Sequence, residues 1–521
     1  MVRLLSDTAN SGIYVSEGLS SSQPIAVRRE TVVAFLGAAA RGPVGIPVTV
    51  TSTEEYLNRF GAPNCENPLY ETVQQFFSNG GSQAIIIRVC SSARRHRIVL
   101  PGPAGSLTLE ALNPGPHEIL RAAVDYDGVA ATEPERFNLV IHRLSSRLHP
   151  VVEEQEIYSR VTVDISDSEY VGHALLNSEL VSIKGAIPAQ RPDVSFHNGV
   201  EVGASYIYVD PEWPDTESLT DYDLVGCNTE GTGLFALDRL ASVDLVCIVS
   251  DEGSLGPVAL FTAERYCRKR NAVLCIDPPA HWHTVEDALR FSRESGFASP
   301  NVMTYFPRPA DVAGRPGSAI GAITGAMVAV DAKKGIWGGT DREPLTLRGR
   351  LRLPLSLDAD EKNLLRRSGI NALQPLGSSH ADFTGFVTFN RGNGCLPEFD
   401  SLCYRRALLF IVESIVRGTR WAAFQRNEAD TRAELRGQVS TFLQTLHELG
   451  ALTGSRTRDA FYVQCDFDTN SAAHEGNDRG ISFVAGFAVS NHPIQVYRFT
   501  QRRVECEIQL QRTELQIDLA V

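Results

Sequence analysis

The chain has 521 residues, more than one ordinary hydrophobic core uses, so two to four domains are expected. Its apolar content of 43% and charged content of 21% are normal for a globular protein. The net charge of −13 argues against general nucleic-acid binding, because such binding needs a cationic surface that displaces counterions.

The cysteines and the apolar segments indicate in which cellular compartment the protein is made. Ten cysteines are scattered singly without a C-x-x-C pair, so neither a zinc site nor a disulfide framework is indicated, and synthesis in a reducing cytosol fits. The apolar segment after Met1 is far too short for a signal peptide. The longest uncharged apolar stretch, 316–330, is shorter than the ~20 residues of a membrane helix, so we expect no membrane insertion.

Residues 1–27 form a polar, serine-rich N-terminal arm. It carries one apolar triplet, Ile13, Tyr14 and Val15. Such a triplet needs a surface that buries it, either on its own domain or on a neighbouring molecule.

Residues 28–95 have an α/β pattern. A buried strand over 32–36 is followed by a short strand over 47–50 and by a helix that Ser52 caps. A second helix over 68–80 and a strand over 84–89 complete a strand–helix–strand unit.

Residues 96–221 lose the helical periodicity. Apolar residues alternate with polar ones, and proline and glycine divide the segment at 101–103 and 113–116. This pattern predicts a β-rich domain inserted into the α/β one.

The α/β pattern returns in residues 222–395. Continuous apolar strands alternate with helices, which predicts a parallel, doubly wound sheet. The strands are predicted over 243–249, 272–276 and 302–306, and the helices over 257–270 and 284–295.

Glycines recur every four residues at Gly317, Gly321 and Gly325, and each is followed by another small residue. This spacing predicts a helix that packs closely against another element. The carboxylates of Asp358, Asp360 and Glu361 are interpreted as a solvated charge cluster in a polar connector.

Residues 396–500 predict a smaller α+β domain. A helix apolar on nearly all sides runs from Tyr404 to a left-handed cap at Gly418. An amphipathic helix follows, with capping-box spacing at Thr431 and Glu434, an alternative earlier cap at Asn427 and an end at Gly450. Strands are predicted over 461–463, 481–484 and 494–497.

Residues 501–521 predict a C-terminal arm of two short strands with a break at 511–514. Burying the four apolar side chains after the break contributes ~6–12 kcal/mol, and ordering the backbone of 515–521 costs ~7–14 kcal/mol. The arm should therefore order only against a partner sheet. The apolar residues of both arms are the candidate inter-subunit contacts: Ile13, Tyr14, Val15, Val504, Cys506, Ile508, Leu510, Leu515, Ile517, Leu519 and Val521.

No catalytic, cofactor-binding or metal site is indicated. Asp277 with His281 and His283 could supply three metal ligands, but nothing else in the sequence completes the set, and a partly exposed loop is the favoured interpretation. There is no G-x-x-x-x-G-K-[ST] phosphate loop and no G-x-S-x-G serine motif. A large sheet protein with two arms and no active centre favours assembly over turnover.

At this point the chain resembles the contractile tail sheath proteins of bacteriophages and related injection systems. The similar blocks occur in the family's order over both ends and the middle: 11–17, 31–52, 76–89, Asp277-Pro278-Pro279, 334–337, Arg405-Arg406, 413–415, 442–454, Cys465-Asp466 and Thr469-Asn470. Ser11 stands where the family usually has proline, and the inserted domain matches weakly.

The resemblance implies an α/β, multi-domain fold with a subtilisin-like core, a β-rich insertion facing outward and a tube-proximal C-terminal domain. It implies a non-enzymatic subunit of stacked six-membered rings around an inner tube, linked by strand exchange through the arms. Contraction of such a sheath drives the tube through a target envelope. The implied partners are other subunits, the inner tube protein, and baseplate and terminator proteins. Synthesis in a bacterial host cytoplasm precedes assembly into a tail or particle.

Within the C-terminal domain, the exposed charges of Arg432, Glu434 and Arg436 are the candidate inner-tube contact. Two other functions remain open. One is a non-contractile structural component of a virion or injection particle, and the other is a hydrolase on the subtilisin-like fold, which would need a nucleophile–base pair.

Overall fold

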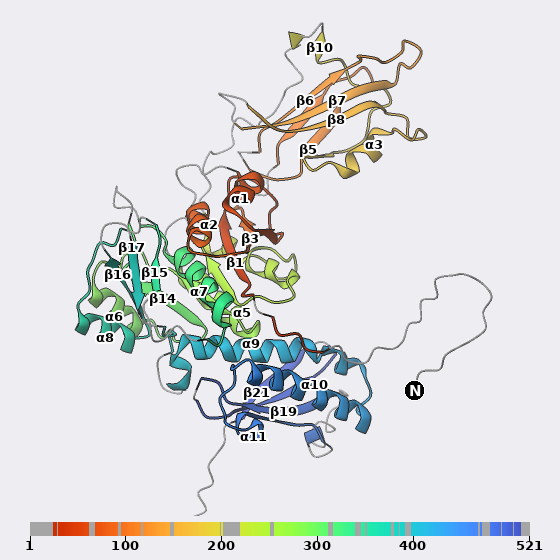
Figure 1. Cartoon of the computed structure of the whole chain (residues 1–521). Helices are drawn as coiled ribbons and strands as arrows, with labels where there is room; N and C mark the ends of the chain where they lie inside the picture. The colour runs from red at the N-terminus through yellow and green to blue at the C-terminus, as the bar shows by residue number, and fades with distance from the viewer. Residues whose placement is uncertain are drawn as a thin grey trace, which may run out of the picture. The chain divides into compact units, whose positions relative to one another are not determined.

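The computed structural model describes 24–28, 30–61, 68–91, 95–115, 118–145, 151–197, 200–201, 219–250, 255–310, 316–338, 345–349, 352–376, 380–384, 386–390, 397–466, 469–470, 480–490, 492–503 and 505–511 (Figure 1). The chain divides into two compact units. The larger unit is Arg29–Phe410, and the smaller one combines Met1–Arg28 with Ile411–Val521. The division falls within helix α9 (Leu402–Gly418), so one helix contributes residues to both units.

A nine-stranded sheet forms the centre of the larger unit. From edge to edge its strands are β15 (Leu345–Leu347), β17 (His380–Thr384), β16 (Asn371–Leu376), β14 (Val302–Phe306), β13 (Val273–Ile276), β12 (Leu245–Ile248), β1 (Val33–Ala38), β3 (Ala84–Val89) and β2 (Val48–Val50). The six strands from β16 to β3 are parallel to one another. Strands β15, β17 and β2 each join the sheet through antiparallel pairing with their neighbours. The predicted parallel arrangement is therefore confirmed for these six strands, and the sheet as a whole is mixed.

Strand β1 joins two segments that the sequence presents separately. It pairs with β3 on one side and with β12 on the other. Residues 28–95 and 222–395 therefore share one sheet rather than two.

Alternate residues of β1 face two different cores. Val33 and Phe35 lie in one cluster, whereas Ala34 and Leu36 lie in the other. The first cluster includes α1 (Thr53–Phe60), α2 (Pro68–Ser78) and α7 (Ile320–Lys334). The second includes α4 (Asp221–Val225), η2 (Gly233–Arg239), α5 (Pro257–Lys269), α6 (Val285–Glu294) and α8 (Ala359–Arg367). Helices thus cover both faces of the sheet, as doubly wound proteins require.

The close packing predicted for the glycine-rich helix is confirmed. A Cβ atom added to Gly321 would lie 1.8 Å from the backbone oxygen of Thr72 on α2. One added to Gly325 would lie 2.3 Å from the backbone oxygen of Phe76. Gly317 precedes α7 and takes no part in this contact.

The carboxylates interpreted as a solvated connector instead begin α8. Asp358 accepts a hydrogen bond from the Glu361 N–H at 2.8 Å, and the Glu361 carboxylate accepts one from the Asp358 N–H at 2.9 Å. This is a capping box, and the D-x-x-E spacing was a signal that the prediction overlooked.

Among the described residues between β3 and α4, most of the regular elements are strands. One sheet holds β4 (Arg97–Leu100), β5 (Leu107–Ala111) and β9 (Val181–Ile183), another holds β6 (Leu120–Asp125), β7 (Arg136–Leu144) and β8 (Val152–Thr162), and β10 (Phe196–His197) pairs with β11 (Val200–Glu201). The short helices α3 (Val171–Ala174) and η1 (Leu175–Asn177) follow β8.

Two arginines of the central sheet region bond to this insertion. The buried guanidinium of Arg88 donates to the Gly42 oxygen at 2.7 Å and to the Pro114 oxygen at 2.8 Å. Arg41 forms an ion pair with Glu153 on β8.

The two helices predicted in the C-terminal region are confirmed, but their ends differ. Gly418 is the last residue of α9 without a left-handed conformation, and a Cβ there would lie 2.5 Å from Ile25. Helix α10 (Ala429–Glu448) has Glu428 at its N-cap, so the capping box predicted at Thr431 is wrong. Gly450, at φ 76°, does follow the helix in a left-handed conformation. The remaining elements are η3 (Pro397–Asp400), η4 (Arg420–Phe424), α11 (Thr457–Ala460), β18 (Phe461–Gln464), β19 (Ile481–Phe487), β20 (Gln495–Gln501) and β21 (Cys506–Gln511).

Candidate functional site

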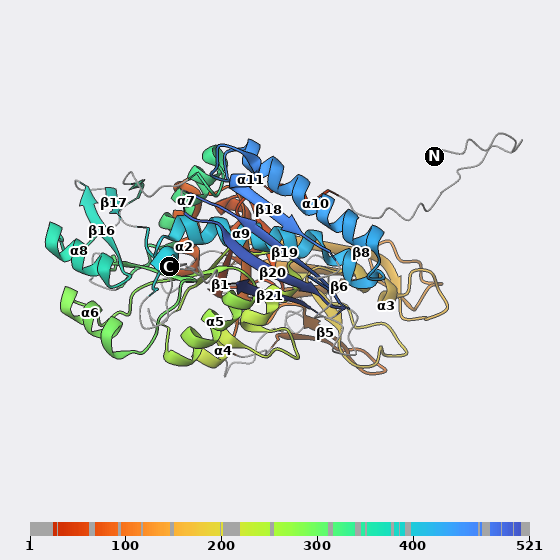
Figure 2. The same cartoon turned by 90° about the horizontal axis from the view of Figure 1, so that it is seen from below.

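A four-stranded antiparallel sheet in the smaller unit is the candidate assembly site. Its order is β18-β19-β20-β21, and α10 contacts β18 and β19 (Figure 2). Phe483 and Phe499 stack across β19 and β20 with ring centroids 5.0 Å apart, and Phe487 and Tyr497 stack at 5.5 Å. All seven residues of β19 are buried, whereas residues of β21 alternate between half-buried and exposed. The sheet therefore has a fully buried inner strand and a more exposed edge at β21.

The structure corrects the expected C-terminal arm in one respect. Residues 506–511 form β21 and pair with β20 of the same chain, with Gln501 opposite Cys506 and Tyr497 opposite Leu510. Cys506, Ile508 and Leu510 lie half-buried on one face of this strand. An arm available to a neighbouring molecule would therefore begin after Gln511.

Hydrogen bonds that involve α9, Thr419 and η4 hold the connection between β20 and β21. The buried Gln501 amide donates to the Thr419 hydroxyl at 2.7 Å and to the Val416 oxygen at 3.0 Å. Arg420 donates to the Arg503 oxygen at 2.8 Å. These contacts fix where β21 starts, and no sequence pattern indicated them.

The outer side of β21 is a sheet edge. Within the part of the chain that the structure describes, no strand pairs with β21 on the side away from β20. An edge of this kind can accept a further strand, because its N–H and C=O groups are available for pairing. The exposed Glu507 and Gln509 disfavour nonspecific pairing there.

The sequence indicated Asn470 only as part of a block similar to the sheath family. In the structure its side chain bonds to the backbone of Ser482. Its amide donates to the Ser482 oxygen at 2.9 Å and accepts from the Ser482 N–H at 2.8 Å. The buried amide thus closes the start of β19. An asparagine at a turn was a signal that the sequence offered. Its partner Ser482, 12 residues away, could not be identified from the sequence.

Several predicted contact residues lie outside the described residues: Ile13, Tyr14, Val15, Val504, Leu515, Ile517, Leu519 and Val521. Their roles as inter-subunit contacts remain predictions.

The candidate inner-tube contact needs revision. Arg432 is half-buried, and its guanidinium donates to the backbone oxygen of Asn427 at 3.0 Å and to its side-chain oxygen at 2.8 Å. Glu434 is also half-buried, whereas Arg436 is exposed. The three charges were predicted as exposed, and only Arg436 fits that prediction because Arg432 is used at the start of its own helix.

The residues weighed as a metal site do not converge. Asp277 accepts from the Ala319 N–H at 3.2 Å, and burial raises the pKa of its carboxyl despite the nearby Arg308. His281 and His283 are exposed on the following loop. Among the described residues, no three His, Cys, Asp or Glu side chains are grouped to hold a metal ion.

A search for membrane spans covered the same residues. None of the described helices combines the length and the apolar composition that crossing a bilayer demands.

Comparisons with known proteins were made at the level of sequence and of structure. No protein-family model and no curated protein matches the sequence. Solved structures do match. A sheath tail protein from Listeria innocua is similar with a TM-score of 0.62 and 11% identity, over 92% of this chain and 96% of that one.

Two further solved structures have the same fold over nearly the whole chain. The sheath of the extracellular contractile injection system PVC, in its contracted state, has a TM-score of 0.52 and 15% identity over 94% of this chain and 96% of that one. A sheath tail protein from Desulfitobacterium hafniense has a TM-score of 0.51 and 13% identity over 96% and 99%. The chain therefore has the fold of contractile sheath proteins, including both of its units.

Proposed function

We propose that this protein is the subunit of a contractile tail sheath. It polymerises as stacked six-membered rings around an inner tube and contracts to drive that tube through a target envelope. The observation that supports this most is the similarity over more than nine-tenths of the chain to sheath tail proteins and to a sheath in its contracted state. In this proposal the nine-stranded sheet is the subtilisin-like core of the family and has no enzymatic role.

The terminal arms link the rings in this proposal. Residues 512–521 of one subunit leave the edge of its C-terminal sheet and add a strand to a neighbouring subunit. The apolar triplet at Ile13 to Val15 contributes from the other end. The outer side of β21 supports this, because a sheet edge with available backbone groups is the surface that strand addition requires.

The remaining partners are an inner tube protein, a baseplate and a terminator protein. We propose that the subunit is made in a bacterial host cytoplasm and assembled there into a virion tail or an injection particle. A non-contractile structural protein with the same fold would form one lattice only, so electron micrographs of the polymer with both a long, narrow and a short, wide lattice would favour contraction.

Deleting residues 512–521 is expected to abolish sheath formation while leaving the thermal unfolding of the subunit unchanged. The deletion spares β21, so the chain keeps its own sheet intact. Negative-stain electron microscopy measures the polymer, and differential scanning calorimetry measures the fold. Deleting 502–521 is the comparison, because it removes β21 and should also destabilise the smaller unit by uncovering β20.

A matched pair of substitutions separates side-chain burial from added charge. Ile517→Asp with Leu519→Asp should block assembly, whereas Gln516→Asp with Ala520→Asp adds the same charge at the alternate positions and should not. Normal contractile tubes formed by the 512–521 deletion would overturn the proposed arm.

Reversing the charge of Arg436 is expected to weaken co-assembly of the sheath with its inner tube. Arg436 is the exposed member of the predicted contact on α10. Arg436→Glu should lower the yield of tube-filled sheaths in pull-down and electron microscopy, with sheath polymerisation alone unaffected. The control is Arg458→Glu, which reverses another exposed arginine of the same unit, on α11. If both variants co-assemble as the unaltered protein does, the tube contact lies elsewhere.

A further inference from the structure

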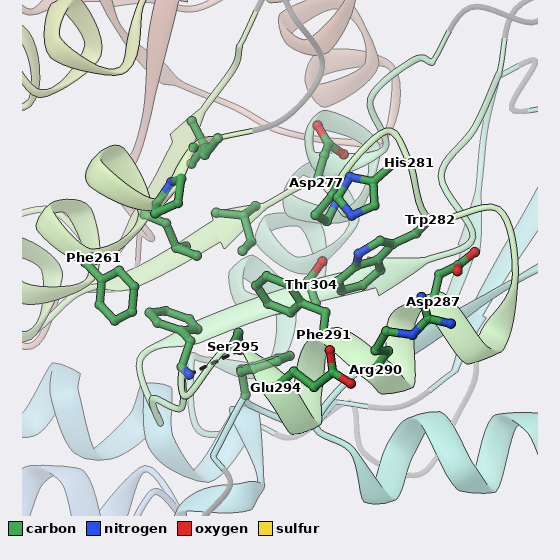
Figure 3. A pocket seen from close by; sticks show the side chains of 18 residues that line it. Phe261, Asp277, His281, Trp282, Asp287, Arg290, Phe291, Glu294, Ser295 and Thr304 are labelled. Atoms are coloured by element: carbon green, nitrogen blue, oxygen red, sulfur yellow. Dashed lines mark hydrogen bonds between the residues drawn. The ribbon is translucent and has the colours of Figure 1, made fainter.

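An open cavity of about 630 Å³ lies between α5 and α6, beside the carboxyl end of β13 (Figure 3). Its walls are largely apolar and aromatic, with Leu260, Phe261, Ile276, Phe291, Phe297 and Phe389 among them. This volume lies within the range of small-molecule sites. In doubly wound sheets, ligands bind in the crevice outside the carboxyl ends of the strands, which is where this cavity lies.

Two polar side-chain atoms in the cavity wall have no hydrogen-bond partner in the structure. They are the indole Nε1 of Trp282 and the hydroxyl of Thr304. Trp282 is 5% exposed and Thr304 is 2% exposed. A buried donor without a partner costs about 1–3 kcal/mol, so two of them in the wall of one cavity indicate groups that a bound molecule would satisfy.

The charges around the cavity restrict what can bind there. Asp287 and Glu294 line the cavity together with Arg290. Asp277 also belongs to the wall, but its carboxyl accepts a hydrogen bond from the Ala319 N–H and lies near Arg308. The hydroxyl and backbone N–H of Thr284 lower the pKa of the Asp287 carboxyl, which therefore stays ionised at neutral pH. Two carboxylates against one arginine disfavour an anionic ligand.

We propose that this cavity binds a small, neutral aromatic molecule that carries a carbonyl group. The aromatic body would pack between Phe291 and the other rings of the wall, where offset and edge-to-face contacts are available. The carbonyl oxygen would accept a hydrogen bond from the Trp282 N–H, and the Thr304 hydroxyl would donate a second one. This proposal does not depend on the proposed sheath function.

The test titrates the purified full-length protein with 6-propionyl-2-(dimethylamino)naphthalene, a neutral ketone whose emission shifts to the blue when it is buried. Saturable binding with one site per chain is expected. Thr304→Val keeps the approximate shape of the side chain, and Trp282→Phe keeps an aromatic ring. Each removes one polar group and should weaken binding about five- to tenfold. Trp337→Phe is the control, because Trp337 does not line the cavity.

A comparison of ligands on the unaltered protein tests the same proposal without any variant. 2-(Dimethylamino)naphthalene lacks the carbonyl and should bind more weakly than the ketone, while the anionic 1-anilinonaphthalene-8-sulfonate should compete poorly with it. Absence of saturable binding by the ketone would overturn the proposal. Equal binding with and without the carbonyl would also overturn it, as would folded Trp282→Phe and Thr304→Val proteins that bind as tightly as the unaltered one.

Discussion

Gly321→Ala is expected to lower the free energy of unfolding of the larger unit by ~3 kcal/mol or more, at the upper end of overpacking costs. The new methyl group would lie 1.8 Å from the Thr72 backbone oxygen and 2.7 Å from its carbonyl carbon. Both atoms belong to the backbone of α2, so no side-chain rotation relieves the clash and the two helices must separate. Urea unfolding followed by circular dichroism measures the effect.

Gly325→Ala should act in the same direction, because its methyl group would lie 2.3 Å from the Phe76 oxygen. Gly437→Ala is the matched control. Gly437 also lies within a helix, but nothing is within 4 Å of an added Cβ there. Alanine at that position should stabilise the helix by ~0.5–1 kcal/mol. Equal stability of the Gly321→Ala protein and the unaltered protein would show that α2 and α7 are not in close contact.

Arg406→Met is expected to destabilise the larger unit by ~3–5 kcal/mol, since it leaves a buried carboxylate without its cation. Arg406 forms an ion pair with Asp331 of α7, and both side chains are 5% exposed. Burial alone would lower the pKa of the Arg406 guanidinium, but the Asp331 carboxylate outweighs burial and the net shift is upward. The Thr31 hydroxyl also donates to Asp331 at 2.7 Å, so this carboxylate joins three separate segments of the chain.

Two comparisons test whether the unpaired Asp331 carboxylate causes the lower stability of the Arg406→Met protein. Arg406→Met combined with Asp331→Leu removes both charges and should recover much of the stability, because apolar pairs often replace buried ion pairs without cost. Arg293→Met removes one partner of the exposed ion pair with Glu286 and should cost less than ~1 kcal/mol. Thermal unfolding of the four proteins measures all these differences. A loss below ~1 kcal/mol for Arg406→Met alone would contradict the assigned role of the pair.

The sequence predicted the elements better than their partners. Strands β12, β13 and β14 were predictable because each is a continuous apolar run, as a strand covered on both faces must be. The pairing of β1 with β12 was not predictable, because it joins Val33 to Leu245 across the whole inserted segment. Local patterns carry no information about such long-range pairing.

The candidate site shows the same limit. Alternation identified 506–510 as a strand, but β21 pairs with β20 because Gln501 and Arg420 fix the turn between them, and these contacts are tertiary. Arg432 was predicted as exposed because it lies off the apolar stripe of its helix. Its bond to Asn427 depends on where α10 begins, and the capping box predicted at Thr431 placed the N-cap three residues too late.

The pairing of β1 with both β3 and β12 also bears on how this protein can vary. The β-rich segment lies between β3 and β12 in the sequence, and both of these strands belong to the nine-stranded sheet. Forming that sheet therefore closes a long loop of the chain. The entropy of closing such a loop grows only logarithmically, and doubling its length costs just ~0.6 kcal/mol. The inserted domain can therefore be exchanged for one of very different size with little penalty to the sheet, provided that the contacts of Arg41 and Arg88 are replaced. Such a junction favours diversification of the insertion while the sheet stays the same.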